Sequence, residues 1–215
     1  MNWLEFLDLA FGGDALQIKW MQRMVGYASL GFPKGHIVAC VGDSRDAKVA
    51  FFNGLLMAMD PGAVVYFPDR MLRRDGLLRQ GPSPEIAMLK GAFLAVFDLP
   101  RGIEGGMSLS LNTLASGEVL VGRQLWARSA ESFPNSATPF LILESIPLPE
   151  SLPENLCWRI RRVVFASGVQ LPDGILADLR GDADAIRSWV EVGTREWREH
   201  GLEMPTSAEL KAVAS

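Results

Sequence analysis

Residues that could bind a phosphate gather after one short apolar run. Ile37 to Val41 reads as a buried strand, Gly42 ends it, and Lys48 follows where a helix with apolar residues at helical spacing begins. A loop between strand and helix with a lysine at the helix start matches much of the phosphate-binding pattern G-x-x-x-x-G-K-[ST]. Asp43 and Ser44 lie within that loop. The sequence therefore predicts the frame of a nucleotide site at this loop.

Two positions of that pattern carry the wrong residue. Ala47 stands where a glycine lets the backbone wrap the phosphates, and Val49 stands where a hydroxyl holds Mg²⁺. The lysine itself, Lys48, has two interpretations: a phosphate ligand at a helix N-terminus, or an ordinary solvated lysine. The incomplete motif predicts that ATP with Mg²⁺ is bound weakly or not at all.

A second candidate is an acid at the end of another apolar run. Asp98 follows Ala92 to Phe97, a continuous apolar stretch typical of a buried parallel strand. It could direct Mg²⁺, or it could be a strand-end carboxylate that caps the next loop. One acid without the loop hydroxyl holds Mg²⁺ poorly, which favours the cap.

Composition excludes several other classes of protein. The chain has 215 residues, of which 48% are hydrophobic and 21% charged, enough for one substantial domain with a real core. Its net charge of −4 argues against a generally basic nucleic-acid-binding surface. The two cysteines, Cys40 and Cys157, are far apart and read as reduced core thiols of a cytoplasmic protein. No long apolar run predicts a membrane span, and the isolated His36 and His200 form no metal site.

The surrounding elements predict an α/β fold. Apolar periodicity indicates helices at residues 3–11, 15–30, 49–59 and 107–115 and from 172 onward. Apolar runs indicate strands at 37–41, 63–67, 92–97, 138–143 and 158–165, and residues 117–126 read as one arm of a hairpin followed by a turn-rich segment at 127–138. This alternation favours a mostly parallel central sheet. The six tryptophans are most simply core and helix-packing residues.

The order of these segments resembles the superfamily 3 helicase domain of phage and plasmid primase–helicases, a branch of the AAA+ ATPases. The resemblance covers essentially the whole chain. No single motif is specific, but seven stand in the right order: IKWMQRMVGYASLG, the incomplete phosphate loop, LKGAFLAVFD, LASGEVLVGRQLW, PFLILESIPLP, CWRIRRVVF, and the stretch from Gly181 to Ser207.

The resemblance implies roles for further residues. Asp98 matches the acidic position that directs Mg²⁺, and Glu144 or Ser145 stands where the family has a sensor asparagine. Arg123 and Arg128 belong to the segment leading into a hairpin that touches DNA, although both could be plain surface charges.

The same resemblance places an arginine finger near the last strand. Arg159 and Arg161 alternate onto one face of that strand and Arg162 onto the other. Either of the first two could reach a neighbour's nucleotide. The simpler alternative is a strip of salt bridges at a subunit contact, which we expect to face acids near Asp43 or Asp46.

Together these observations predict an AAA+-type P-loop NTPase-like core at residues 31–168, between helical segments at 1–30 and 169–215. The predicted function is a degenerate helicase-like module of phage or plasmid DNA replication that binds nucleotide weakly with little or no hydrolysis. An active ATP-dependent DNA helicase and a non-catalytic pseudo-ATPase that serves as an interaction subunit stay open. The expected partners are single-stranded DNA and further copies in a ring, or another replication protein.

Overall fold

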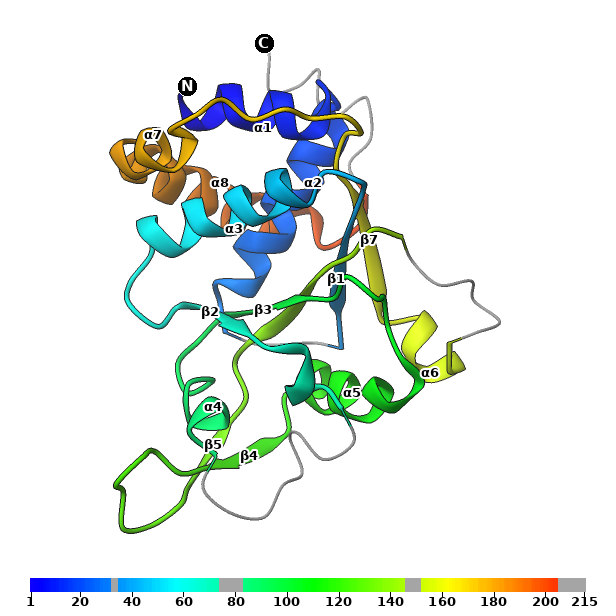
Figure 1. The fold of residues 1–215 in the computed structure, drawn as a ribbon, viewed down its shortest axis with the longest axis vertical. Coiled ribbons are helices and arrows are strands. Elements are labelled where there is room, and N and C mark those ends of the chain that lie inside the picture. Colours follow the sequence, from blue (N-terminus) through cyan, green and yellow to red (C-terminus); the bar gives the residue numbers. More distant parts are fainter. Residues whose placement is uncertain (32–34, 74–82, 146–151, 205–215) are drawn as a thin grey trace.

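A five-stranded parallel sheet forms the centre of the protein (Figure 1). The computed structural model describes residues 1–31, 35–73, 83–145 and 152–204. The strands run in the order β2-β3-β6-β1-β7, and all four neighbouring pairs are parallel. Their bounds are β1 Ile37–Val41, β2 Val64–Phe67, β3 Leu94–Asp98, β6 Thr138–Ile142 and β7 Ile160–Val164. The predicted α/β class with a mostly parallel sheet is confirmed, and the layout is that of a P-loop NTPase-like protein.

Helices cover both faces of this sheet, which explains why its strands are continuous apolar runs. Every residue of β1 and β6 is buried, as expected for strands that have neighbours and helices on all sides. β7 lies at an edge, and of its residues only Val163 is fully buried. The two sets of inward side chains belong to two separate hydrophobic clusters, one on each face.

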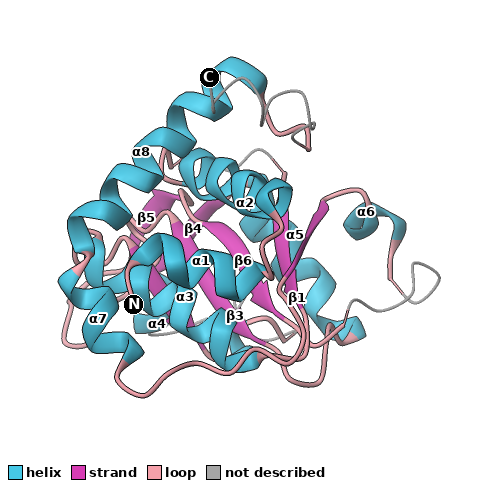
Figure 2. Ribbon diagram, turned by 90° about the horizontal axis from the view of Figure 1, so that it is seen from above, coloured by secondary structure: helices cyan, strands magenta, loops and turns pink. Residues whose placement is uncertain are grey.

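The first face carries the helices from both ends of the chain together with the helix that follows β1 (Figure 2). Trp3, Phe51 and Trp189, from three of these helices, contact one another in its core, and both Trp3 and Phe51 meet Trp189 edge to face. The helices are α1 Trp3–Phe11, α2 Ala15–Ala28, α3 Arg45–Ala58, α7 Ile175–Gly181 and α8 Ala183–His200.

Two glycines let α2 and α8 cross in near backbone contact. A Cβ atom on Gly193 would lie 2.0 Å from the carbonyl oxygen of Gln22, and one on Gly26 would lie 2.2 Å from the backbone of Gly193. No side chain fits at either position.

The predicted division into segments 1–30, 31–168 and 169–215 stays a prediction.

The second face carries shorter elements and a hairpin. The strands β4 Val119–Gly122 and β5 Glu131–Pro134 pair antiparallel, and β4 packs against α4. The remaining elements are η1 Asp69–Met71, α4 Pro84–Ala87, η2 Gly105–Met107, α5 Ser108–Ser116 and α6 Glu154–Cys157. In the described part of the chain, none of the helices has the length and apolar character to cross a bilayer.

Most predicted elements are present, with three differences. The turn-rich segment at 127–138 contains β5, the second arm of the hairpin. The short helix α6 was not predicted. The helix expected to begin near Lys48 begins earlier, at Arg45, and this difference changes the candidate site.

Candidate functional site

The carboxyl ends of three strands bring the predicted nucleotide-site residues together. Because the strands are parallel, β1, β3 and β6 end at the same edge of the sheet, where open α/β sheets bind their ligands. Gly42 follows β1 and donates its N–H to the carbonyl oxygen of Glu144, 3.2 Å away, just beyond β6. Asp98 is the last residue of β3 and pairs with Ile142 in the β3–β6 ladder. The structure thus brings Gly42, Asp98 and Glu144 to one edge.

Helix α3 occupies most of the expected phosphate loop. Ser44 is its N-cap, and only Asp43 and Ser44 separate Gly42 from the first helical residue, Arg45. Ser44 Oγ accepts the N–H of Ala47 at 3.4 Å, and Arg45 N–H donates to the carbonyl oxygen of Asp43 at 2.9 Å. Two backbone N–H groups of this stretch, those of Arg45 and Ala47, therefore already have acceptors within the chain.

The sequence supplies reasons for this early helix start. Serine is a strong N-cap residue, and an acidic residue in the first turn, here Asp46, interacts favourably with the helix dipole. Alanine at position 47 favours a helix by about 1 kcal/mol over the glycine of the phosphate-loop pattern. The expectation of a loop up to Lys48 was wrong because these local preferences extend the helix by one turn.

Lys48 is buried at the border of this edge and contacts backbone groups of its own chain. Its side chain is 1% exposed. Its Nζ donates to the carbonyl oxygen of Leu143 at 2.7 Å and to that of Gly42. Burial lowers the pKa of the ammonium group. Lys48 therefore joins the end of β1 to the end of β6, and the interpretation as a solvated lysine was wrong.

Arg45, which the sequence analysis did not single out, pairs with Asp98. Its Nε donates to Asp98 Oδ2 at 2.8 Å, and a second guanidinium nitrogen contacts the same oxygen. The hydrogen bond to Asp98 raises the pKa of Arg45. A guanidinium thus lies beside the carboxylate that was expected to direct Mg²⁺ or to cap a loop.

The space left at this edge is small. A cavity of about 220 Å³ lies between the ends of β1, β3 and β6 and the start of α3, below the range of about 300–1,000 Å³ that ligand pockets usually have. Outside the loop, a more open hollow of about 430 Å³ is lined by Asp43 and Asp46. Arg45 lines the same hollow but is paired with Asp98, so the two carboxylates of Asp43 and Asp46 disfavour a phosphate there.

The remaining predicted residues of this site offer little to a metal or nucleotide. Val49 packs against the core of the first face, so its side chain brings no oxygen to the site. Glu144 and Ser145 are exposed, and Glu144 contributes its backbone carbonyl to the loop. Asp43 Oδ1 accepts the N–H of Gly168 at 3.2 Å, which ties the loop to the segment after β7.

The three arginines near β7 lie in different surroundings. Arg159 precedes the strand and stacks on Trp158, with its guanidinium carbon 4.4 Å from the ring centroid. Arg161 donates to the carbonyl oxygen of Trp158 at 2.8 Å, whereas Arg162 is exposed. His36 lies close enough to both Arg159 and Arg161 to feel their charge. Two of the three arginines are therefore held by their own chain.

The hairpin tip carries the predicted DNA-binding arginines and one residue that was misread. Arg123 and Arg128 lie between β4 and β5, and neither has a carboxylate partner within the described residues. Trp126 lies between them, is 99% exposed and has a positive φ of 68°. The expectation that the tryptophans are core residues was wrong for Trp126 and for Trp158, which is 56% exposed. In the sequence, Arg123, Arg128 and Gly122 near Trp126 could have indicated that this tryptophan lies at an exposed hairpin tip.

Comparisons with known proteins identify a fold but no family. No family model matches the chain, and no curated protein does. Solved structures titled "The A form apo structure of NrS-1 C terminal region-CTR" and "The apo structure of NrS-1 C terminal region (305-718)" match 98% of it, with TM-scores of 0.64 and 0.63 and 14% identity. The chain spans about half the length of these structures, 49% and 50%. At this identity the likeness shows the fold alone.

The buried contacts of Lys48 predict a structural role. In Lys48→Met, the carbonyl oxygens of Gly42 and Leu143 lose their donor while the apolar stem is kept. We expect the free energy of unfolding, measured with urea, to fall by about 1–3 kcal/mol because buried acceptors stay unsatisfied. Lys90→Met is the matched control: Lys90 is exposed and pairs with Glu131, so its loss should cost less than about 1 kcal/mol. Equal effects of the two substitutions would refute the structural role.

The surroundings of His36 predict a pH-dependent stability. Burial, together with the charges of Arg161 and Arg159, lowers the pKa of His36 from 6.5 to about 4. Between these values the unfolded chain takes up a proton that the folded protein does not. The contribution of His36 to stability is therefore complete above pH 6.5 and is lost as the pH falls toward 4.

Urea unfolding at several pH values checks this prediction. His36→Gln should lose less stability than the parent protein between neutral pH and pH 4.5. His200→Gln, a substitution at an exposed position of α8, should leave the pH dependence of the parent unchanged. If the profiles of the parent and His36→Gln run parallel, His36 is not the group responsible.

Proposed function

We propose that this chain is a helicase-like module of the AAA+ type from a phage- or plasmid-type DNA replication system, and that it works without turning over ATP. The parallel sheet, the order of the seven motif segments and the fold shared with the NrS-1 C terminal region support the first part. The second part rests on the geometry at the carboxyl edge of the sheet.

One observation carries the proposal: the chain's own cations lie where a nucleotide and its metal would have to bind. Arg45 pairs with Asp98, and Lys48 is bound by two backbone carbonyls. Phosphoryl transfer depends on Mg²⁺ and on a lysine that reaches the phosphates. To bind ATP with Mg²⁺, Lys48 would have to leave its backbone carbonyls and Arg45 would have to leave Asp98. Val49 offers no hydroxyl to bind the metal.

This arrangement distinguishes the three functions left open by the sequence. An active helicase needs the loop to open at every cycle, against the contacts of Lys48 and the ion pair of Arg45. A weak or absent nucleotide site needs no such change. The same contacts therefore favour a module that acts by binding DNA and protein partners.

The hydrolysis rate tests the central claim. We expect the isolated protein to release phosphate from ATP with Mg²⁺ at well under about 1 s⁻¹, the low end of typical turnover numbers. A ligand that binds the folded state at 100 times its Kd stabilises it by about 2.7 kcal/mol and raises the unfolding temperature. We expect ATP with Mg²⁺ to cause no such rise, because it does not bind the closed loop. A phosphate-release rate of about 1 s⁻¹ or more that disappears in Lys48→Ala would overturn the proposal.

Single-stranded DNA is the partner that the hairpin tip fits best. Arg123 and Arg128 offer two cations to a phosphate backbone, and the fully exposed Trp126 between them offers a flat face to a base. Aromatic stacking combined with arginine contacts is the usual mode of binding single strands without sequence preference. The tip supplies this locally, although the chain as a whole carries a net charge of −4.

Binding to a fluorescent oligothymidine checks this role. We expect weak binding that falls with salt. In Arg123→Ala/Arg128→Ala the slope of log affinity against log salt should drop by about 1.4, because each phosphate contact in a single strand contributes about 0.7. Trp126→Ala should cost about 1–3 kcal/mol. Arg180→Ala, at an exposed site on α7, is the control. Unchanged binding in both hairpin variants would exclude the tip.

Assembly through the β7 edge follows from the same resemblance. Arg162 is exposed beside the anchored Arg161, and Asp46 is exposed at the start of α3. A head-to-tail contact between these two surfaces closes into a ring when the rotation between subunits fits. The ion pairs would need no nucleotide.

Light scattering on the nucleotide-free protein checks the assembly. We expect an oligomer at low salt that dissociates as salt screens the exposed charges. Arg161→Glu/Arg162→Glu should give a monomer, and Arg180→Glu should not. A monomer at every salt and protein concentration, or an oligomer indifferent to the double substitution, would refute this interface.

A further inference from the structure

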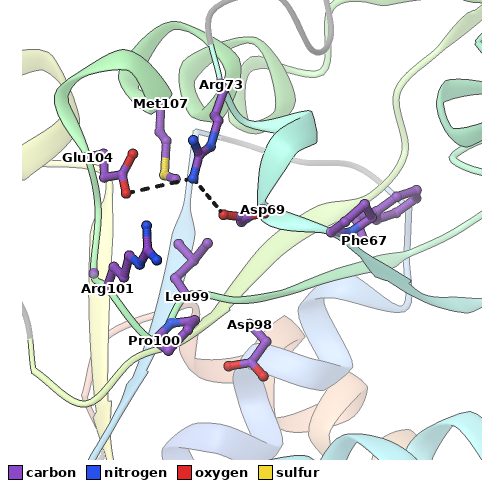
Figure 3. A pocket seen from close by; sticks show the side chains of 11 residues that line it. Phe67, Asp69, Arg73, Asp98, Leu99, Pro100, Arg101, Glu104 and Met107 are labelled. Carbon is purple, nitrogen blue, oxygen red and sulfur yellow. Dashed lines mark hydrogen bonds and ion pairs between the residues drawn. The ribbon is translucent and has the colours of Figure 1, made fainter.

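A second pocket lies beside the closed loop, at the ends of β2 and β3 (Figure 3). Its volume of about 470 Å³ falls within the usual range of small-molecule sites, whereas the 220 Å³ cavity at the loop does not. Only Asp98 and Pro100 border both spaces. Nothing in the motifs of the sequence assigned a role to this pocket.

The floor of the pocket is apolar and rigid. Phe67, Leu99 and Met107 line it and are 5%, 1% and 2% exposed. Phe67 is held in place by stacking on Phe97, with ring centroids 5.5 Å apart. Such a floor suits the planar apolar body of a ligand.

The rim of the pocket carries two arginines in different states. Arg73 is held by Asp69 at 3.0 Å and lies 3.9 Å from Glu104, and Figure 3 shows it between these two carboxylates. Arg101 reaches the pocket from the loop after β3, and none of the described carboxylates lies within ion-pair distance of it. Within the described residues, Arg101 therefore offers a guanidinium without a carboxylate partner to a ligand.

The charges around the pocket limit the charge of that ligand. Asp69, Arg73 and Glu104 together carry one net negative charge, and Asp98 is neutralised by Arg45. One anionic group can pair with Arg101, but a chain of phosphates would meet the carboxylates on the opposite rim. Those carboxylates also accept hydrogen bonds from N–H groups at the edge of a ring.

We propose that this pocket binds a nucleoside monophosphate unit, with its phosphate on Arg101, its base on the apolar floor and base N–H groups facing Asp69 and Glu104. The unit is either a free nucleotide or one nucleotide of a single strand, since both present the same chemistry. The site needs neither the closed loop nor the hairpin tip, so it stands apart from the function proposed above.

Calorimetric titration with deoxyadenosine 5′-monophosphate tests the proposal. We expect the full chain to bind it more tightly than inorganic phosphate, which lacks the base, and more tightly than deoxyadenosine, which lacks the anion. Arg101→Gln removes one charged hydrogen-bonding group and should weaken binding at least about tenfold. Arg180→Gln, the same change at an exposed site on α7, should not. Both arginines are exposed, so neither substitution threatens the fold.

A competition experiment distinguishes the two sources of the ligand. In Arg123→Ala/Arg128→Ala, where the hairpin contributes little, a short oligodeoxyadenosine displaces the monophosphate if the pocket takes part of a strand, and does not if it takes a free nucleotide. The proposal is overturned if the monophosphate does not bind, if Arg101→Gln binds it as well as the parent, or if inorganic phosphate binds equally tightly.

Discussion

A buried ammonium group holds the carboxyl edge of the sheet together. Lys48 reaches from α3 to the carbonyl oxygens of Gly42 and Leu143, which follow β1 and β6. A buried charge without partners is costly, so these two carbonyls must stay where they are. Gly42 has a φ of 138°, and a Cβ atom there would lie 2.7 Å from the carbonyl oxygen of Phe165. The lysine thus fixes a loop that only glycine can form.

Two of the acids around that loop have partners within the chain. Arg45 neutralises Asp98, and Asp43 accepts a backbone N–H from the segment after β7. In an ATPase, the corresponding lysine and acid gain their full set of partners only when nucleotide and metal bind, and that difference drives the cycle. Here Lys48 and Asp98 already have partners within their own chain. ATP binding would therefore first have to break these contacts.

The sequence predicted the sheet better than the site. Fully apolar runs identified β1, β3 and β6 because strands buried on both faces tolerate little else. The burial of Lys48 was also visible, since Phe52 and Leu55 lie four and seven residues further on and form the same buried helix face. The phosphate-loop pattern obscured it. Ser44 as an N-cap gave an equally clear signal for the early helix start.

Other features depend on contacts between distant residues. The pair of Arg45 and Asp98 joins residues 53 positions apart, and no spacing rule says which strand end lies beside the start of α3. The exposure of Trp126 depends on β5, whose polar sequence and central proline-flanked phenylalanine gave a weak strand signal. The pocket at Arg101 requires that β2 and β3 end side by side. For the Arg45–Asp98 pair and the pocket, the missing information is the order of strands in the central sheet, and for Trp126 it is the second arm of the hairpin.

The distribution of arginines separates internal from external tasks. Arg45 and Arg161 donate hydrogen bonds to groups of their own chain. Arg101, Arg123 and Arg128 have no described carboxylate partner and lie at a pocket rim and a hairpin tip, away from the closed loop. We propose anionic ligands for these three cations because positive charges at such places attract them. Lys48 and Arg45 tie the ends of β1, β3 and β6 together at the same edge of the sheet, so the loop after β3 presents Arg101 from a fixed base.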